Sequence, residues 1–581
     1  MYKAFVNGER LDFENPSITL RLRNPMFDPQ NGMEWTASFP FKIPATPRNK
    51  AILGFPARLS AEVLSTTDLS FEHYFNGLRL PGDSIRVRQA NDKQFEAYIR
   101  IGRSDFISAT KDLSLHQLQF PLEEVLLEDI YSLLENGTGY PDTDYAFPTV
   151  KNDGLYDGHP YESDWKSPTL NNLGPYQNAI FKLYGDTEFS INNNTVSPLP
   201  FVAGANRKIF EILGYKLTSD VFASNQHLRP LCIYSPVVAR GDGPDAINFH
   251  LKYQLPDIKI PNYFLALRMP FAIDLYFNYY HKTVDIKSRK DVLNDPSFID
   301  FTKGVAGNPT VIHSESIANY KLKMKNDSAD TYWSEKVADF ANYELNTKYY
   351  VDSVGDLPAS PEPNSLGLVK DEDQWYIFTW DDPLNVYMWK LFSQNHMDFQ
   401  LFTTEATSYE AEIGPLLSED HDHNELPFSL ITPKVYKKGR KQEAPLDLNN
   451  PAQPFSLRLL MNRGLAETSD GSLYPSGSSF SGLLANTPVP ANPFSLQWFG
   501  PNQASAYPEY GLYTNFWSDF MAFQTISKPI EFIKVISAYD LFTLDWTKKY
   551  YALGTLMILN EITFTITSRE IKPAKVKAWT Y

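Results

Sequence analysis

The sequence contains one cysteine, Cys232, among 581 residues, so no disulfide bond can form within the chain. Small secreted domains depend on disulfides, and a chain of this kind depends on its hydrophobic cores instead. Cys232 lies in the segment RPLCIYSP, among apolar neighbours and with no histidine beside it. Because a reactive thiolate needs a nearby cation or base, we expect this side chain to act as a small buried hydrophobe.

Long apolar runs are also missing. No run of about 18 apolar residues, the length needed to cross a bilayer as a helix, occurs in the chain. The N-terminal segment MYKAFVNGERLDF lacks the apolar stretch of a signal peptide. We therefore expect a protein with no membrane span, made in a reducing cytoplasm.

Positive charge is in short supply. The chain has 53 Lys and Arg against 69 Asp and Glu, a formal net charge of −16. This balance disfavours binding to nucleic acids and to anionic membranes, both of which attract clustered Lys and Arg. An acidic wall would instead repel DNA and let it pass without sticking.

Complete catalytic and metal-binding motifs are absent as well. In SEDHDHNE, His421 and His423 would share one face of a strand, but the spacing supplies no third ligand and a solvated acidic loop is the better interpretation. GSSFSG resembles a nucleophile elbow, yet the frame around Ser479 ends in Ser481 where the motif requires glycine. We predict no enzyme activity, no catalytic residue, no metal and no cofactor.

Aromatic residues and proline, by contrast, are abundant. Aromatics make up 14% of the chain and proline contributes 42 residues, a composition that favours many short strands joined by turns. Asn7-Gly8 and Asn76-Gly77 lie between alternating segments and predict hairpins with type I′ turns. Further strands are expected at DSIRVRQ, FEAYIRIG and LMILNEITFTI, the last with Ile562, Phe564 and Ile566 as an exposed strand and an aggregation hazard if unpaired.

An α+β unit is expected in the middle of the chain. Apolar residues from Ala205 to Leu213 recur at helical spacing, and Gly214 follows where the helix would stop. A short helix is expected after Asn262, broken by Pro270, and then two strands joined by a turn near His281. The fold class is therefore mainly β with an α+β insert.

Shifts in composition divide the chain into five parts. We expect an N-terminal β-barrel-like domain (1–135), an excursion rich in aromatics, Pro and Gly (136–200), an α+β insert (201–300), a mixed peripheral domain (301–445) and a C-terminal β domain (446–581). No short tandem repeat is present.

The stretch SFPFKIPATPRNKAILGFPARLS, residues 38–60, carries four prolines. Proline cannot donate to a sheet ladder and restricts the residue before it, so a central strand is excluded here. We expect an extended, irregular segment whose only helical piece is PRNKAILG. Proline also reduces the freedom of the unfolded chain, which suits an arm lying across a neighbouring subunit or a strap over the chain's own barrel.

This stretch and its flanks resemble the N-terminal region of tail-tip (baseplate) hub proteins of tailed bacteriophages and prophages. In that family, FPFxxPxTPxNxxxxGxPxR follows the first strands. The matching positions are Pro40, Pro44, Thr46, Pro47, Asn49, Gly54, Pro56 and Arg58, with Gly82 later. The segments LGYKLTSDVF, FNYYHKTVDIKSRKDVL and LDWTKKYYALGTLMILNEITFTITSREIKPAKVKAWTY are also similar to hub segments, so the resemblance covers about half the chain.

The resemblance implies two tube-like β-barrel domains, N-terminal and C-terminal, with smaller peripheral domains outside. It implies a homotrimer in the virion tail tip, made in the host bacterial cytoplasm, that closes or adapts the tail tube and forms part of the DNA exit path. Implied partners are a distal-tail ring or tail tube protein, a tape measure protein and peripheral tail fibre proteins. The interface candidates are Pro40, Pro44, Pro47, Asn49, Pro56 and Arg58.

Two other functions stay open. A distal-tail ring protein would be hexameric, so ring stoichiometry distinguishes it from a hub. A tail-associated host-surface glycan-binding protein or depolymerase would have a sugar cleft lined by Trp and paired carboxylates, so glycan binding distinguishes it.

Overall fold

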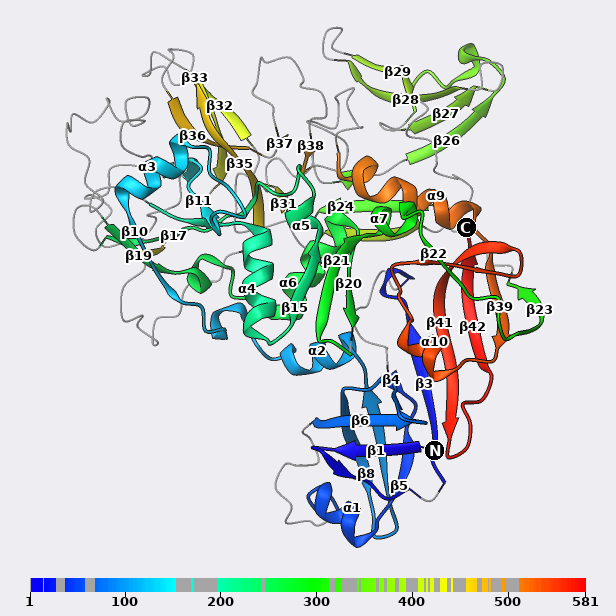
Figure 1. Cartoon of the computed structure of the whole chain (residues 1–581). Helices are drawn as coiled ribbons and strands as arrows, with labels where there is room; N and C mark the ends of the chain where they lie inside the picture. The colour runs from blue at the N-terminus through cyan, green and yellow to red at the C-terminus, as the bar shows by residue number, and fades with distance from the viewer. Residues whose placement is uncertain are drawn as a thin grey trace.

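The computed structural model describes residues 2–13, 15–27, 37–57, 68–152, 169–171, 196–241, 246–278, 280–312, 319–324, 342–343, 346–361, 365–369, 374–381, 386–392, 406–411, 414–415, 418–422, 429–435, 440–441, 456–467, 473–478, 480–481, 494–496 and 511–581. Within these residues, no helix has both the length and the apolar character needed to span a bilayer. The chain is mainly β with an α+β body, as the sequence predicts (Figure 1).

A 15-stranded sheet carries both ends of the described chain. Its main path runs β2-β1-β6-β8-β9-β4-β3-β41-β42-β39-β23 and curls into two half-barrels, one built from N-terminal strands and one from C-terminal strands (Figure 1). The N-terminal strands are β1 Tyr2–Val6, β2 Glu9–Arg10, β3 Ser17–Arg23, β4 Ala37–Ser38, β5 Phe41–Pro44, β6 Leu69–Phe75, β7 Leu78–Arg79, β8 Ser84–Ala90 and β9 Gln94–Arg100. The others are β22 Phe298–Asp300, β23 Val305–Val311, β39 Pro529–Lys534, β40 Lys549–Ala552, β41 Thr555–Thr567 and β42 Ala574–Thr580.

Both predicted hairpins are confirmed. Asn7 and Gly8 have φ of 49° and 82°, and Asn76 and Gly77 have φ of 51° and 86°. These positive values are the ones a type I′ turn requires at both central positions. The local turn chemistry therefore fixes the register of β1 with β2 and of β6 with β7.

The two half-barrels meet where β3 pairs with β41. Seven residue pairs in antiparallel register, from Ser17 with Thr567 to Arg23 with Glu561, join the start of the chain to its end. β41 also pairs with β42 and, through its first residues, with β40. The prediction of an exposed strand at Ile562 to Ile566 is therefore wrong, because β41 is an interior strand whose isoleucines lie in the core.

The α+β body lies beside the sheet and is built around helices and one three-stranded sheet. Its strands, in sheet order, are β15 Lys216–Asp220, β21 Thr283–Ser288 and β20 Ile273–Asn278. Its helices are α2 Arg103–Thr110, α3 Leu127–Glu135, α4 Val202–Ile212, α5 Val221–Ser224, α6 Ile260–Phe271, α7 Arg289–Asn294 and α9 Ser518–Ile526, the last preceded by a π-helical turn, Tyr513–Trp517. Single 3₁₀ turns cover Pro25–Phe27, Leu115–Gln117, Leu251–Gln254 and Val354–Asp356.

The body confirms most of the predicted α+β unit. α4 spans the predicted helical stretch, and Gly214 follows it with φ of 74°. The predicted second helix is confirmed, but α6 starts at Ile260, before Asn262, and contains Pro270 in its last turn. Proline near the end of a helix removes one hydrogen bond, and burial of Tyr263, Phe264 and Phe271 outweighs that loss.

Smaller sheets complete the chain. Those beside the body comprise β10 Leu122–Leu126, β19 Ala246–His250 and β18 Arg240–Gly241; β11 Tyr145–Ala146 and β14 Leu199–Pro200; β13 Thr169–Leu170, β12 Val150–Asn152, β33 Ser429–Val435 and β32 Ser418–Asp422; β16 Leu231–Ile233, β35 Arg458–Glu467, β31 Gly414–Pro415 and β36 Leu473–Ser478; β17 Val237–Val238 and β34 Arg440–Lys441; and β37 Phe480–Ser481 and β38 Phe494–Ser495. Two more are β25 Asn342–Tyr343, β24 Asn319–Met324 and β30 Ala406–Ala411, and the peripheral sheet β26 Asn346–Val351, β27 Ser365–Val369, β28 Gln374–Asp381 and β29 Val386–Phe392. The five predicted domain boundaries stay a prediction.

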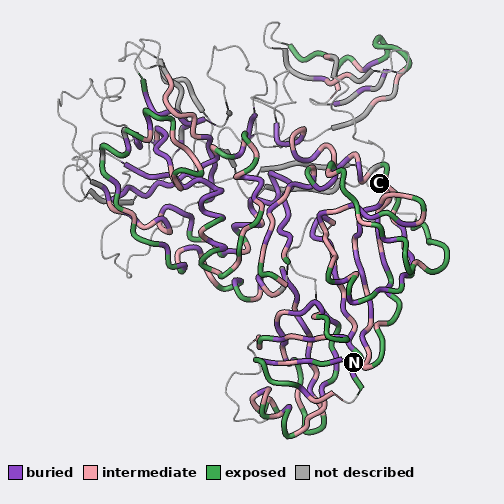
Figure 2. Tube along the Cα trace, viewed as in Figure 1, coloured by how far each residue is buried: buried purple, intermediate pink, exposed green. Residues whose placement is uncertain are grey.

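Two large cores stabilise this arrangement. One fills the α+β body, and the other runs through both half-barrels, from Tyr2 and Val6 to Val576 and Ala578 (Figure 2). A third, small core contains Cys232, which is 0% exposed. Burial raises the pKa of the Cys232 thiol well above its ordinary value, so the prediction of an inert, buried side chain is confirmed.

Candidate assembly surface

The proline-rich segment folds against the N-terminal half-barrel. β5 pairs with β9 alone, which places Pro44 at the end of an edge strand, as proline requires. Helix α1, Pro47–Ile52, begins after Thr46, whose side chain accepts a hydrogen bond from the Asn49 amide, and Pro47 occupies its first turn. The prediction of one extended piece followed by one short helix is confirmed.

Asn49 anchors this segment to the rest of the half-barrel. Its Oδ1 accepts a hydrogen bond from the Asp12 amide at 2.9 Å, and its Nδ2 donates to the carbonyl oxygens of Asp12 and Pro44, both at 2.9 Å. The residue is 0% exposed. Because Asn49 satisfies three backbone groups of its own chain, its contacts here are those of an intramolecular strap.

The other interface candidates lie nearer the surface. Pro40 and Pro47 are exposed, whereas Pro44 and Pro56 are half-buried. Arg58 lies outside the described residues. The exposed proline rings leave one side of the segment available for contact with another chain.

A ladder of charged side chains crosses the solvent face of the sheet where the two half-barrels join. Arg21 and Arg23 on β3 bind Glu561 on β41, at 2.7 Å and 2.8 Å. Lys577 on β42 lies 3.6 Å from the same carboxylate, and Lys575 binds Glu531 on β39 at 2.7 Å. Partial burial alone would raise the pKa of Glu561, but the two guanidinium groups lower it below its ordinary value.

Charge is unevenly divided along the chain. Residues 1–100 and 528–581, which supply most of the large sheet, contain 21 Lys and Arg against 16 Asp and Glu. The intervening residues, 101–527, contain 32 Lys and Arg against 53 Asp and Glu. The acidity of the protein therefore belongs to the parts between the two sheet-forming segments, and the sheet itself has a small cationic excess.

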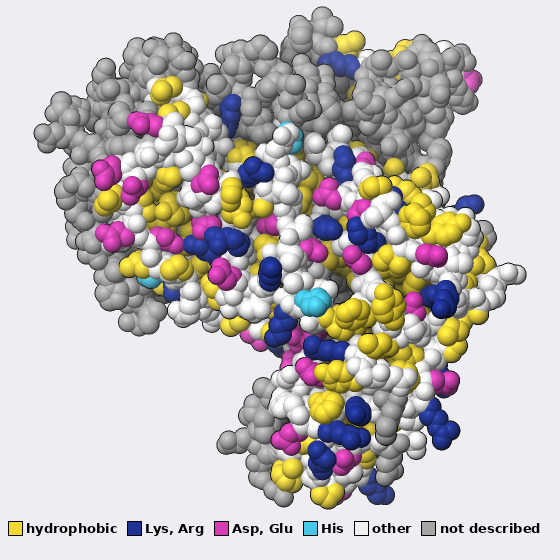
Figure 3. Space-filling model, in the orientation of Figure 1, with side chains coloured by type: hydrophobic (Ala, Val, Ile, Leu, Met, Phe, Trp, Pro, Cys, Tyr) yellow, Lys and Arg dark blue, Asp and Glu magenta, His cyan; other side chains and the backbone are white. Residues whose placement is uncertain are grey.

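Exposed hydrophobic side chains gather on the C-terminal half-barrel. Helix α10, Ala538–Phe542, carries Tyr539 and Phe542, which are 65% and 46% exposed, and the adjoining Val535 is 54% exposed. Figure 3 shows hydrophobic side chains collected over α10 on this face of the molecule. Clusters of exposed apolar side chains are typical of surfaces that contact other proteins.

The edge of the sheet at β23 is protected against strand addition. β23 is paired on one side by β39, contains Gly307 and Pro309, and breaks register between Ala306 and Thr310. Bulges and prolines are common devices that prevent an edge strand from pairing with another chain. Contact between copies through this half-barrel is therefore expected to use side chains rather than the β23 backbone.

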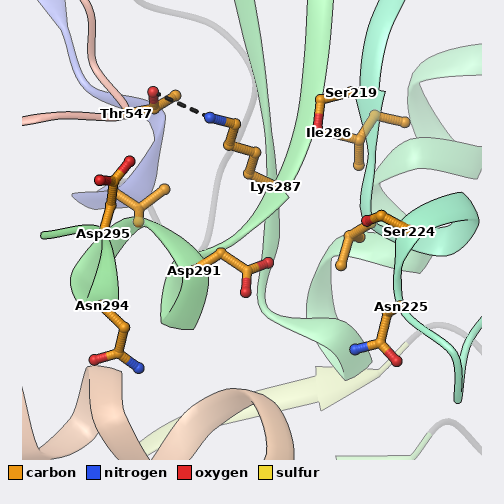
Figure 4. A pocket seen from close by; sticks show the side chains of 11 residues that line it. Ser219, Ser224, Asn225, Ile286, Lys287, Asp291, Asn294, Asp295 and Thr547 are labelled. Atoms are coloured by element: carbon orange, nitrogen blue, oxygen red, sulfur yellow. Dashed lines mark hydrogen bonds between the residues drawn. The ribbon is translucent and has the colours of Figure 1, made fainter. Parts of the chain in front are cut away.

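A cleft of about 520 Å³ lies where the α+β body meets the loop before β40. Figure 4 shows its walls, with Lys287 reaching across to Thr547, whose hydroxyl oxygen lies 3.3 Å from the lysine Nζ. The remaining lining residues are Ser219, Val221, Ser224, Asn225, Ile286, Asp291, Val292, Asn294 and Asp295. Asp295 is held by Lys548 at 2.7 Å, so this lining offers no aromatic platform and no free carboxylate pair of the kind a glycan-cleaving site needs.

The interpretation of SEDHDHNE as a loop is wrong for Ser418–Asp422, which form strand β32 paired with β33 and contain His421. His423 lies outside the described residues, as does Ser479 of GSSFSG. Across the residues that the structure describes, no group of three or more His, Cys, Asp or Glu side chains could hold a metal ion.

No family model matches this chain, and no curated protein matches it in sequence. Among solved structures, it is similar to the crystal structure of prophage MuSo2, 43 kDa tail protein from Shewanella oneidensis, with 7% sequence identity and a TM-score of 0.33 over 99% of this chain and 95% of that chain.

Proposed function

We propose that this chain is a structural component of a phage tail tip, a hub that closes or adapts the tail tube. The observation that carries the proposal is the pairing of β3 with β41, which joins N-terminal and C-terminal half-barrels in one sheet with the other domains inserted between them. This order matches the one implied by the residues resembling hub proteins, from Pro40 to Arg58 and in the closing segment.

In this proposal three copies form a ring. Two half-barrels in each copy would present six similar units to a six-fold tube, and a closed ring is the usual result of repeated head-to-tail contacts. The exposed side chains of α10 and the proline segment are the surfaces we propose for contact between copies or with peripheral tail proteins. The role is structural, and the chain's own residues are not proposed to perform chemistry.

Ring stoichiometry tests the proposal. We expect light scattering on the assembled protein, or a tail-tip reconstruction, to give three copies of this chain. Six copies would contradict the hub function and support a distal-tail ring protein. A stable monomer that binds host-surface glycans would contradict both and support a glycan-binding tail protein.

A further inference from the structure

The N-terminal half-barrel is joined to the α+β body where β9 ends and α2 begins. Arg100, the last residue of β9, pairs with Ala37 on β4 and with Ser84 on β8. After Arg100 the chain leaves the N-terminal half-barrel through Gly102, whose φ is 53°, and enters α2 of the body. A residue in the left-handed conformation, which glycine adopts readily, therefore links the last strand of the half-barrel to α2.

Side chains from both sides of this joint hold it together. Asp68, directly before β6, accepts a hydrogen bond from the Ser108 hydroxyl on α2 at 2.6 Å and contacts Arg100 on β9. Asp83, directly before β8, accepts a hydrogen bond from the Gly102 amide at 2.5 Å. The N-terminal half-barrel is thus tied to α2 through the oxygens of two carboxylates.

A third carboxylate, Asp105 on α2, faces the same cluster. Burial raises the pKa of Asp83 to about 7, and it also raises the pKa of Asp105. The charged groups around the three carboxylates are Arg79, Arg86 and Arg100 of the half-barrel and Lys282 of the β20–β21 turn, with Tyr215 of the body also facing Asp83 and Asp105. Burial disfavours the ionised form of Asp83 and of Asp105, and the neighbouring carboxylates add repulsion that the surrounding cations partly offset.

The α+β body also contacts this part of the half-barrel through β20 and the β20–β21 turn. Tyr280, in the β20–β21 turn, donates a hydrogen bond from its hydroxyl to the Arg79 carbonyl at 3.0 Å. A Cβ at Gly102 would lie 3.3 Å from Cβ of Phe277 on β20, so the backbone at Gly102 packs closely against β20 of the body. The cluster therefore lies inside a contact between two parts of the molecule.

We propose that Asp68, Asp83 and Asp105 form a protonation-controlled latch between the N-terminal half-barrel and the α+β body. With Asp83 neutral, the joint closes without removing a charged carboxylate from water. When Asp83 ionises, the closed joint keeps water from its charge and holds it near Asp105, and this favours an open joint in which α2 separates from the half-barrel. The inference does not depend on the function proposed above.

Proton binding by Asp83 sets the direction of the pH dependence. In the closed joint, Asp83 keeps its proton up to about pH 7. In an open, solvated joint, the pKa of Asp83 returns toward 3.8, its ordinary value. The closed form therefore binds more protons between these values, and it loses its advantage as pH rises through 7. For one such group, the opening equilibrium constant grows about tenfold between about pH 6 and about pH 8.

Hydrogen exchange on the full chain tests this latch. Peptides covering α2 should show about tenfold faster opening at about pH 8 than at about pH 6, after correction for the chemical exchange rate. Peptides from β41, remote from the joint, should show no such change. Equal pH dependence in both segments, or none in α2, would overturn the proposal.

Variants separate the latch from a general effect of pH. Asp83→Asn mimics the neutral carboxyl, so it should keep α2 protected at both pH values, and Asp105→Asn should slow opening at about pH 8. Asp92→Asn, an exposed change in the β8–β9 turn, should keep the wild-type response. If Asp83→Asn and Asp105→Asn both retain the tenfold change, the carboxylates do not control the joint.

Discussion

At the scale of single residues, His73 is a buried polar side chain whose two ring nitrogens both form hydrogen bonds. It is 0% exposed, and its Nε2 lies 2.7 Å from the Pro81 carbonyl while its Nδ1 lies 3.1 Å from the Tyr2 hydroxyl. Since a carbonyl only accepts, Nε2 carries the proton and Nδ1 accepts from Tyr2. Burial lowers the pKa of His73 to about 4, and Gly82 leaves the ring its space, since a Cβ there would lie 3.1 Å from Nε2.

This environment predicts acid sensitivity of the half-barrels. The folded protein binds fewer protons at His73 than the unfolded chain between about pH 6.5 and 4, so about 3 kcal/mol of stability is lost as pH falls through that window. His73→Gln should start less stable at pH 7 but lose less on acidification. Urea unfolding at several pH values measures this, and His281→Gln, in an exposed turn, should behave as wild type.

Asp274 holds two arginines in the core of the body. Its Oδ1 lies 2.6 Å from Arg268 and its Oδ2 lies 3.0 Å from Arg289, and both Asp274 and Arg289 side chains are 0% exposed. The Arg289 guanidinium also lies over Phe520, 4.5 Å from the ring centroid. The carboxylate ties β20 to α6 and α7, and the Arg289 guanidinium extends the cluster to α9.

Removing that carboxylate should leave two buried cations without a counter-ion. We expect Asp274→Asn to cost about 3–5 kcal/mol in free energy of unfolding. Asp112→Asn, in a side chain 77% exposed beside Lys111, should change it by less than about 0.5 kcal/mol. A small loss for Asp274→Asn in urea unfolding would mean that solvent reaches the cluster.

At the scale of elements, local chemistry was predictable and long-range pairing was not. The Asn-Gly hairpins, helix α4 and the break at Gly214 depend on neighbouring residues, so their patterns appear in the sequence. The alternation in β41 predicts a strand but not its partners, because β3 lies more than 500 residues away along the chain. The latch carboxylates were missed for the same reason: Asp68, Asp83 and Asp105 form no motif until the fold brings them together.

The interior position of β41 predicts a sharp contrast between neighbouring residues. Phe564 is 2% exposed in the core, whereas Thr565 on the opposite face bonds Thr19 through hydroxyls 2.8 Å apart. Phe564→Ala should cost about 3–5 kcal/mol, and Thr565→Ala about 1 kcal/mol or less. Similar losses for the two variants in urea unfolding would contradict the pairing seen here.

At the scale of the whole molecule, assembly and stability should respond differently to the proline segment. Pro40, Pro44 and Pro47 each lower the freedom of the unfolded chain, so each change to Ala should cost about 1 kcal/mol or less. If the segment contacts another copy, the triple variant should lose ring assembly more than it loses thermal stability. Pro573→Ala, in an exposed loop, is the control, and equal losses in both measurements would identify the segment as an intramolecular strap.

The pairing of β3 with β41 also has a consequence for biosynthesis. On the ribosome, β3 emerges early, but its partner at residues 555–567 emerges only after more than 500 further residues have been made. At a translation rate of about 5–20 residues per second, one edge of β3 stays unpaired for roughly half a minute or longer. The body can fold meanwhile from segments that are already present. A nascent chain released before residue 555 would expose the apolar face of β3, so holding chaperones are expected to bind such chains and only finished chains to enter assembly.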